Sequence, residues 1–300
     1  MSDIYDLVIV GGGPAGLTSA IYGLRNGHSV AVIERDVFGG QITSSPSVLN
    51  IPGFNKISGD EYGDLLLEQV SNLGGELVFD ECVKVSPGDV ITVNLKDTGD
   101  ILCKSLILAT GSVHRRLNVE HEEELIGKHV HFCAVCDAGL YKDKTVVLIG
   151  GGNSALVEAD ILANICKKVI ILQDLSEFTG EVSLIKQLES HDNITTYFNS
   201  KDIKYLVDDK FRGVSSNGKE ILCDGVFLAI GLVPDNKYFK DLLDLDDRGY
   251  FIADENGYTK YDNIFVAGDC RQKMLRQVVT ACGDGANCAI NASRYLRGVK

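Results

Sequence analysis

The sequence has no excess of positive charge. Its 300 residues include 29 Lys and Arg against 42 Asp and Glu, which gives a formal net charge of −13 at pH 7. A protein whose main target is nucleic acid or an anionic membrane presents the opposite sign of charge. We therefore exclude nucleic acid and membrane as the main partners of this chain.

The sequence also lacks a long apolar run. No stretch reaches the roughly 18 consecutive apolar residues that suggest a membrane-spanning helix. No basic segment or cleavage site precedes the first apolar strand, which starts shortly after Met1. We therefore expect a cytoplasmic protein that is neither secreted nor inserted in a membrane.

The cysteines do not suggest a disulfide-stapled fold. There are nine, an odd number, and most occur singly in apolar runs. We interpret the single cysteines as small buried side chains. They are Cys82, Cys103, Cys166, Cys223, Cys270, Cys282 and Cys288.

The other two cysteines form a motif with an acid. Cys133 and Cys136 are separated by two residues, and Asp137 follows at once. Such a pair can close a small disulfide ring, and the carboxylate can supply or remove a proton as the ring opens. The pattern therefore predicts thiol–disulfide exchange. The motif alone leaves two alternatives open, which are a tetrahedral zinc site completed by His129 and His131 and a purely structural pair.

A glycine-rich loop near the N-terminus predicts a dinucleotide site. The apolar run 7–10 is followed by the G-x-G-x-x-G loop 11–16 and a helical pattern through Leu24, and a second apolar run ends in Glu34. Glycines at this spacing let the backbone approach a pyrophosphate at the helix N-terminus. An acid about 20 residues further on is placed to hold a ribose hydroxyl.

A second loop of the same kind predicts a second nucleotide-type domain. The apolar run 144–149 leads into Gly150-Gly151-Gly152-Asn153-Ser154-Ala155 and then a helical pattern through Ile165. The chain is long enough for two domains. We predict an α/β fold with two Rossmann-like (three-layer ββα) nucleotide-binding domains, the second inserted into the first. The expected boundaries are 1–115 and 246–300 for the first domain and 116–245 for the inserted domain that carries the CxxC pair.

Together these motifs resemble the low-molecular-weight thioredoxin reductase family, and the likeness covers nearly the whole chain. It extends over Gly39-Gly40-Gln41-Ile42, Asn50-Ile51-Pro52-Gly53, Ala109-Thr110-Gly111, Ile264 to Asp269 and Arg276-Gln277-Val278. The resemblance implies a homodimeric FAD flavoprotein that reduces a thioredoxin-like protein, and it favours a redox disulfide over zinc, so no metal is expected. The residues that it implies for FAD binding are Gly11, Gly13, Pro14, Ala15, Gly16, Glu34, Arg35, Gly40, Gln41, Asn50, Val83, Ala109, Thr110, Gly111, Gly268, Asp269, Arg276, Gln277 and Val278.

The family resemblance also implies roles within the motif. Cys136 would face the flavin, Cys133 would attack the external disulfide, and Asp137 would be the acid–base catalyst. The family has Gly after this Asp, whereas Ala138 and Gly139 follow here. Two other classes remain as remote alternatives, a flavin-dependent thiol oxidase and a non-enzymatic FAD redox sensor.

The inserted domain departs from the family where the 2′-phosphate of NADPH would be held. The family has a histidine and arginines along this segment, but here it reads Gln173-Asp174-Leu175-Ser176-Glu177-Phe178-Thr179. A phosphate needs a cationic partner. In this respect the chain resembles the ferredoxin-dependent flavin thioredoxin reductases, and we expect ferredoxin as the electron donor. The alternative is NADH with its ribose on Asp174, and NADPH is less favoured still.

The C-terminal segment offers a candidate surface for an acidic carrier. Residues 270–300 contain a single acid, Asp284. Its basic residues are Arg271, Lys273, Arg276, Arg294, Arg297 and Lys300. If these residues shared a face they could steer an acidic ferredoxin, and the alternative is an ordinary solvated helix with scattered basic side chains.

Overall fold

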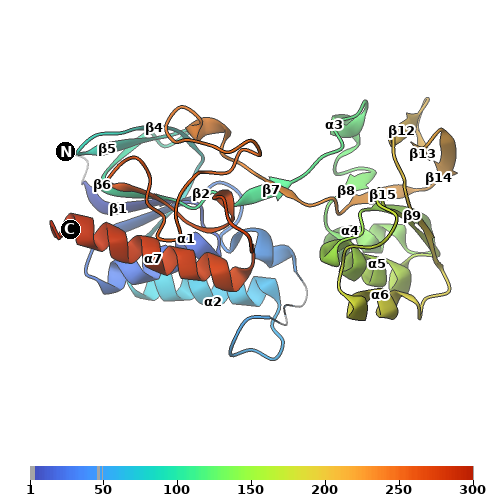
Figure 1. Ribbon diagram of the computed structural model, residues 1–300, viewed down its shortest axis with the longest axis horizontal. Helices are drawn as coiled ribbons and strands as arrows, with labels where there is room; N and C mark the ends of the chain where they lie inside the picture. The colour runs from blue at the N-terminus through green and yellow to red at the C-terminus, as the bar shows by residue number, and fades with distance from the viewer. Residues whose placement is uncertain (1–3, 46–47, 49, 300) are drawn as a thin grey trace. The chain divides into compact units, whose positions relative to one another are not determined.

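The computed structural model describes residues 4–45, 48 and 50–299, and it divides into two compact units (Figure 1). The first unit comprises 1–113 and 233–300, and the second comprises 114–232. The chain leaves the first unit along β7 (Ser112–His114) and returns along β16 (Leu232–Pro234). The predicted α/β fold with one Rossmann-like domain inserted into another is confirmed.

The expected domain boundaries differ from those of the structure. His114 and Arg115 belong to the second unit, whereas 233–245, expected in the inserted domain, belong to the first. The reason is burial, because Phe239 and Leu242 pack into the core of the first unit. In addition, the side chain of Asn236 donates hydrogen bonds to the carbonyls of Gly249 and Cys270.

The first unit is built on a mixed sheet. Its parallel strands follow the order β3-β2-β1-β6, β17 also pairs with β6, and β5 and β4 extend the sheet in antiparallel fashion. The strands are β1 (Tyr5–Val10), β2 (Val30–Glu34), β3 (Glu76–Phe79), β4 (Cys82–Ser86), β5 (Ile91–Leu95), β6 (Asp100–Leu108) and β17 (Ile264–Val266). The helices are α1 (Pro14–Arg25), α2 (Gly59–Asn72) and α7 (Val278–Leu296), with single 3₁₀ turns η1 (Gly40–Ser44), η3 (Lys237–Phe239) and η4 (Gly268–Cys270).

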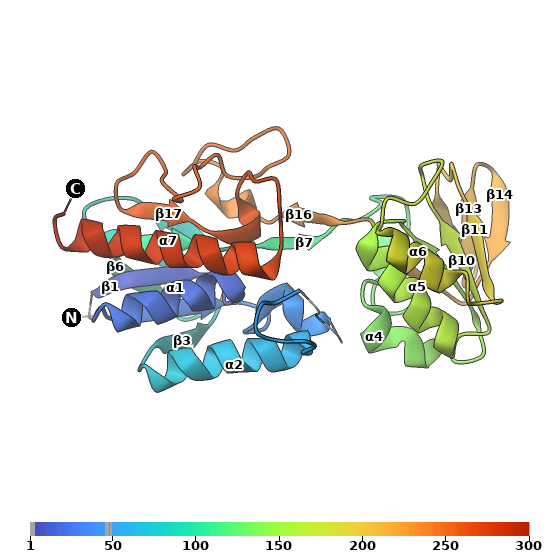
Figure 2. The same cartoon turned by 60° about the horizontal axis from the view of Figure 1, so that its bottom comes forward.

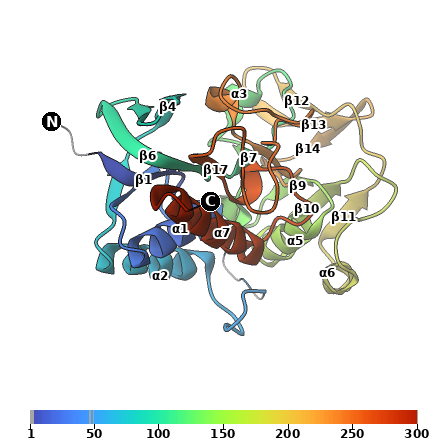
Figure 3. The same ribbon diagram turned by 60° about the vertical axis from the view of Figure 1, so that its left-hand side comes forward.

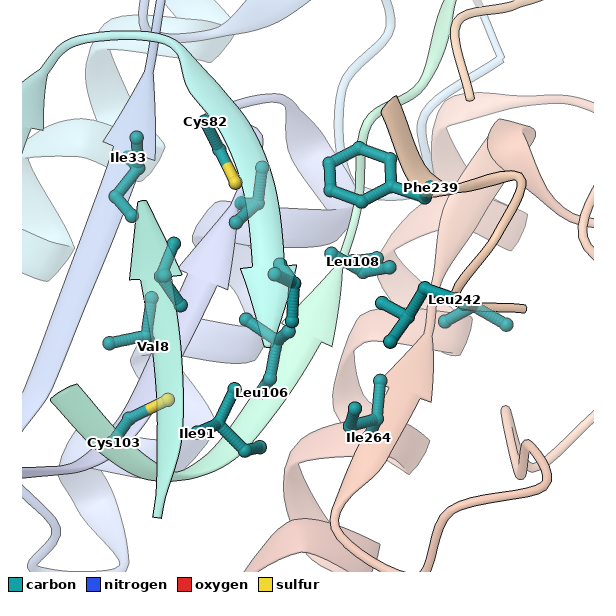
Figure 4. Packing of buried hydrophobic residues seen from close by; sticks show 14 of the residues in the cluster. Val8, Ile33, Cys82, Ile91, Cys103, Leu106, Leu108, Phe239, Leu242 and Ile264 are labelled. Atoms are coloured by element: carbon teal, nitrogen blue, oxygen red, sulfur yellow. The ribbon is translucent and has the colours of Figure 1, made fainter. Parts of the chain in front are cut away.

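Alternate residues of the central strand face two different cores. Leu7 and Ile9 pack under the helices, where α1 and α7 lie side by side (Figures 2 and 3). Val8 and Val10 belong to the opposite core with Phe239, and Figure 4 shows Val8 and Phe239 in this core. A strand buried on both faces reads as a continuous apolar run, which is why the sequence predicts it well.

The second unit repeats this plan. Its parallel sheet has the order β11-β10-β9-β15-β8, and a separate antiparallel sheet has the order β12-β13-β14. The strands are β8 (Val130–His131), β9 (Thr145–Ile149), β10 (Lys168–Leu172), β11 (Ile194–Tyr197), β12 (Lys204–Val207), β13 (Phe211–Ser216), β14 (Lys219–Leu222) and β15 (Gly225–Leu228). The helices are α3 (Glu122–Leu125), α4 (Ala134–Asp137), α5 (Asn153–Ile165) and α6 (Val182–Leu188), with one 3₁₀ turn, η2 (Ala138–Tyr141).

Each unit places a glycine directly after the strand that leads into its glycine loop, β1 in the first unit and β9 in the second. Gly11 has φ 111° and Gly150 has φ 132°, a region that favours glycine. A Cβ on Gly11 would overlap the carbonyl oxygen of Ala109, and a Cβ on Gly150 would overlap that of Ala229. The two loops are therefore equivalent, and each leads directly into a helix.

In the described part of the chain, no helix combines the length and apolar character needed to cross a bilayer.

Candidate active site

In the first unit, segments far apart in sequence gather at the N-terminus of α1. A Cβ on Gly40 would lie 2.8 Å from the Cα of Gly13, and a Cβ on Gly268 would lie 2.7 Å from the Cβ of Ala15. Gly11 lies against Ala109, as described above. The structure therefore brings together the loop 11–16, the turn at Gly40 and Gln41, the segment 109–111 and the turn at Gly268 and Asp269, four of the regions predicted to bind the cofactor.

Glu34 lies at the end of β2 as its spacing predicts. Its carboxylate accepts the N–H of Gly12 at 2.7 Å and the N–H of Asp36 at 2.8 Å. It thereby fixes the glycine loop and presents a carboxylate beside it. Arg35 forms ion pairs with Glu81 and Asp235. Burial alone would lower the pKa of Arg35, but Asp235 and the neighbouring Asp36 raise it.

Two observations test whether these residues fit FAD. The N-cap residue of α1 is Gly13, so no N-cap side chain competes with a pyrophosphate for the N–H groups of the first turn. The buried Oδ1 atom of Asp269 has no hydrogen-bond partner among the described residues. Burial raises the pKa of Asp269. A buried carboxyl oxygen without a partner is costly unless a ligand hydroxyl completes it, so the residues fit the group.

Other residues predicted to bind FAD also have defined contacts within the first unit. The Asn50 amide donates to the Gln277 side chain at 2.9 Å, and Val278 begins α7. The Arg276 guanidinium lies 3.9 Å from the centre of the Tyr250 ring and donates to the Asp269 carbonyl. In β4 the pairing with β5 shifts between Cys82 and Lys84, so Val83 falls at an irregularity of the ladder.

The sequence motifs did not predict that Asn236 and Asp284 belong to this site. Asn236 accepts a hydrogen bond from the Thr110 hydroxyl at 2.8 Å and so helps to fix the turn at 109–111. Asp284 accepts the N–H of Gly268 at 3.0 Å. Burial alone would raise the pKa of Asp284, but hydrogen bonds from Arg271 and Lys273 hold it below its usual value.

The same contacts correct the expected basic surface. The side chains of Arg271 and Lys273 are only 6% and 7% exposed because both are bound to Asp284. They are internal counter-ions, and a carrier cannot dock on them. Arg276 is engaged as described above, Arg297 donates to Asn26, and Lys300 lies outside the described residues.

In the second unit, Cys133 and Cys136 form a disulfide with a Cα–Cα distance of 5.4 Å. Cys133 precedes the short helix α4, and its Sγ accepts the N–H of Cys136 at 3.2 Å. A hydrogen bond to this sulfur favours a thiolate there when the bond is reduced. Ala138, which stands where the family has Gly, is fully buried under the motif.

Asp137 contacts His131, which the sequence suggested only as a ligand of the alternative zinc site. Its Oδ2 lies 3.0 Å from Nδ1 of His131, whose Nε2 lies 2.8 Å from the Tyr141 hydroxyl. His129 instead contacts the carbonyl of Asp224. Over the described residues, no cluster of three or more metal-ligating side chains occurs. The four side chains of the zinc alternative are therefore not gathered as a tetrahedral set.

The second glycine loop carries a different partner from the first. Gln173 is 3% exposed, and its amide lies where a Cβ on Gly151 would be. It therefore occupies the position that Glu34 has in the first unit. The residues after Gln173 then fold back onto the glycine loop. The N–H of Thr179 donates a hydrogen bond to the Gly151 carbonyl, and the N–H of Glu181 donates one to the Asn153 side chain. Asp174 is exposed.

Two Rossmann-like units, a cradle that fits FAD and a disulfide beside an acid define a nucleotide-dependent oxidoreductase that acts on disulfides. The comparisons agree with this class. Residues 5–285 match the family "Pyridine nucleotide-disulphide oxidoreductase". A "34.2 kDa protein in rubredoxin operon" from Clostridium pasteurianum is 36% identical over 303 residues, which covers 98% of this chain and 97% of that protein. The thioredoxin reductase of Mycoplasma genitalium is 37% identical over 295 residues, with 96% and 94% covered.

Among solved structures, the thioredoxin reductase of Lactococcus lactis superimposes with a TM-score of 0.93 at 32% identity, covering 98% of this chain and 100% of that one. The chain belongs to the pyridine nucleotide-disulphide oxidoreductase family and, within it, to the low-molecular-weight thioredoxin reductases. The predictions of an oxidoreductase and of FAD as its cofactor are thereby confirmed.

Proposed function

We propose that this flavoprotein reduces the disulfide of a thioredoxin-like protein through Cys133 and Cys136, with reduced ferredoxin as the electron donor. The thioredoxin part is supported by the names of the relatives and by the disulfide beside Asp137. The identity of the electron donor is a separate question, which depends mainly on the residues of the inserted domain.

The proposal of ferredoxin as donor rests mainly on the residues beside the second glycine loop. Residues 173–181 contain three carboxylates, Asp174, Glu177 and Glu181, and no Lys or Arg. A nicotinamide dinucleotide brings a pyrophosphate, and NADPH brings a further phosphate. These groups bind where cations or free N–H groups face them. Carboxylates at this segment oppose such binding.

The position of Gln173 argues against NADH as well. An adenine ribose is held by an acid at the end of the second strand, and Gln173 occupies that place beside Gly151. Asp174 is one residue further on and exposed, so it does not take the place that Glu34 has in the first unit. What supports NADH is the retention of the glycine loop at Gly150.

A one-electron carrier is compatible with the cofactor. When bound, FAD can accept electrons singly or in pairs, so an iron–sulfur protein can replace a nicotinamide. One relative is itself named after a rubredoxin operon. In the first unit we assign the pyrophosphate to the loop 11–16, the adenosine ribose to Glu34 and a cofactor hydroxyl to Asp269. The other residues predicted for FAD would line the same cradle.

We further propose a homodimer, by resemblance to the family, and a cytoplasmic location. The location is supported by seven cysteines that stay free, most of them buried, because reducing compartments keep such thiols unpaired.

The test is anaerobic bleaching of the bound flavin by reduced ferredoxin, NADH and NADPH in separate cuvettes, followed by thioredoxin reduction with the effective donor. Fast bleaching by ferredoxin alone is the expected result. Fast bleaching by either nicotinamide would overturn the donor assignment while leaving the disulfide reductase intact. Oxygen consumption with a dithiol as the electron source would instead indicate a thiol oxidase, and no turnover with any donor would indicate a redox sensor.

A further inference from the structure

His131 links the acid of the redox motif to the protein interior. Its ring nitrogens lie 3.0 Å from Oδ2 of Asp137 and 2.8 Å from the hydroxyl of Tyr141. The His131 side chain is 3% exposed, whereas that of Asp137 is 33% exposed. Asp137 can therefore meet a substrate from solvent while it remains bonded to a buried imidazole.

Aromatic packing fixes the orientation of this imidazole. Phe227 stacks on the ring at 5.4 Å, and Tyr141 meets it edge-on at 5.4 Å. The Tyr141 hydroxyl lies 3.3 Å from the carbonyl of Lys128. Burial raises the pKa of Tyr141 to about 12, so this hydroxyl keeps its proton at neutral pH. Tyr141 therefore takes part as a hydrogen-bonding group and does not ionise.

The two hydrogen bonds of His131 can be counted in protons. When Tyr141 donates to the Lys128 carbonyl, its oxygen accepts from the Nε2–H of His131. Nδ1 and Asp137 then share one proton, since two bare acceptors repel each other. When Tyr141 instead donates to Nε2, the only imidazole proton lies on Nδ1 and points at the Asp137 carboxylate. The first arrangement holds one proton more than the second. Asp137, His131 and Tyr141, which we call the trio, can therefore store a proton when the Tyr141 hydroxyl rotates.

We propose that His131 is a positioning residue that stores the proton which Asp137 delivers to, and recovers from, the thiolates formed during disulfide exchange. The inference rests on the proposed function of Cys133 and Cys136 and adds to it a proton store within the second unit. It also explains why Asp137 is bonded to a buried base on one side and open to solvent on the other.

The exchange balances with one stored proton. The thiolate of Cys133 attacks a disulfide R–S–S–R′, the S–S bond breaks, and R′–S⁻ leaves as R′–SH with the proton of the Asp137–His131 pair. The thiol of Cys136 then gives its proton to the pair, and its thiolate attacks the sulfur of Cys133. R–S⁻ leaves and takes that proton as R–SH. Two electrons and two protons pass to the substrate, and the Cys133–Cys136 disulfide is restored.

Other titratable groups surround the trio and share its electrostatics. Glu158 on α5 accepts a hydrogen bond from the main chain of Ala134, between the two cysteines. The remaining groups that act on Tyr141 are Asp137, Asp224, Cys223 and Cys166.

The test is His131→Asn in the full-length holoenzyme, with His129→Asn as the control. Asparagine keeps an amide near Asp137 but cannot be protonated, and His129 lies on the same segment without touching Asp137. After anaerobic reduction by dithiothreitol, alkylation of Cys133 by iodoacetamide is followed as a function of pH by mass spectrometry. The wild-type profile should show two titration steps, one for the Cys133 thiol and one for the Asp137–His131 pair. The profile of His131→Asn should show only the step of the thiol.

Turnover with thioredoxin should fall about tenfold in His131→Asn, as expected for partial loss of acid–base assistance. A purely structural role would lower the alkylation rate by one factor at every pH. Superimposable profile shapes in wild type and His131→Asn would therefore overturn the proposal. An altered profile in His129→Asn of the same kind would overturn it too.

A second variant keeps the test decisive if His131→Asn does not fold. Tyr141→Phe preserves the ring and removes only the O–H. Without that acceptor the protonated imidazole is less stable, so the second step should move to lower pH, and an unmoved step would overturn the proposal. If the wild-type disulfide resists dithiothreitol, or Cys133 is not alkylated at any pH, the proposed function fails as well.

Discussion

Cys133 receives a main-chain hydrogen bond, whereas Cys136 Sγ receives none from the residues that the structure describes. The N–H of Cys136 lies 3.2 Å from Cys133 Sγ, and the sulfur sits at the start of α4. Both features stabilise negative charge on Cys133 once the disulfide is reduced. This asymmetry supports Cys133 as the nucleophile toward an external disulfide, as the family resemblance implies.

We predict that Cys133→Ser abolishes thioredoxin reduction, with a loss of at least about a hundredfold, because serine cannot form the mixed disulfide. Bound flavin should remain at the wild-type level, since the residues that fit FAD all belong to the first unit. The assays are thioredoxin-coupled turnover and the flavin absorbance of the purified protein. Cys103→Ala is the control, because Cys103 is a free cysteine of the first unit, outside the unit that carries the redox motif, and its replacement should leave turnover intact. Residual turnover near the wild-type rate would show that the nucleophile was assigned wrongly.

At the residue scale, spacing predicts some roles and not others. Glu34 is predictable because an acid at a fixed distance from a glycine loop ends the next strand, and the structure places it on Gly12. Asn236 is not predictable, because its partner Thr110 lies 126 residues away. Asp284 lies only 16 residues from Gly268, but no motif with a fixed spacing links the two. His131 illustrates a third case, in which the residue was noticed but its partner could be known only from the fold.

At the scale of elements, helix α5 packs against the redox motif. Glu158 lies on this helix, largely buried, and accepts a hydrogen bond from the main chain of Ala134. Its other oxygen, Oε2, has no partner in the described part of the chain. Burial raises the pKa of Glu158 to about 8, so its neutral form is favoured in the folded protein.

This burial predicts a pH-dependent stability difference. Because the folded protein binds the Glu158 proton more tightly than the unfolded chain does, stability falls as pH rises from about 4.5 to about 8. Glu158→Gln keeps an acceptor for the main chain of Ala134 and has no proton to lose. The variant should therefore be more stable than wild type at pH 9, by up to about 5 kcal/mol, and nearly equal to it at pH 4.5.

Urea unfolding of both proteins at the two pH values checks this prediction. Glu181→Gln is the control, since Glu181 is exposed and should show no such pH dependence. A constant difference between Glu158→Gln and wild type at both pH values would mean that the carboxyl ionises freely in the folded state.

Elements with a regular pattern were predicted, and elements fixed by distant contacts were not. The glycine loops, β1, β2, β9 and the helices that follow the loops have local signals, namely apolar runs and glycines at set spacings. The segment 233–245 has no such signal. Its place in the first unit depends on Phe239 reaching a core built from strands of other parts of the chain.

At the scale of the whole molecule, the insertion of one unit into another could be predicted because the same strand–loop–helix pattern occurs twice. The family's C-terminal motifs then return after the second copy. The charge distribution was harder to predict. Of the basic residues near the C-terminus, Arg271 and Lys273 are internal partners of Asp284, a pairing that composition cannot show.

That pairing predicts how the donor reaction depends on salt. The chain has a net charge of −13, and ferredoxins are commonly acidic. With Arg271 and Lys273 neutralised internally, long-range repulsion between the two proteins should dominate their encounter. The rate of flavin bleaching by reduced ferredoxin should therefore rise several-fold between about 10 mM and about 150 mM ionic strength, as the screening length shrinks toward 8 Å. Stopped-flow absorbance under anaerobic conditions measures this rate, and reduction by neutral dithiothreitol is the control that salt should not change. A rate that falls with salt would mean that other cations form a docking surface for the carrier, in which case Arg294 and Arg297 would be the first residues to replace.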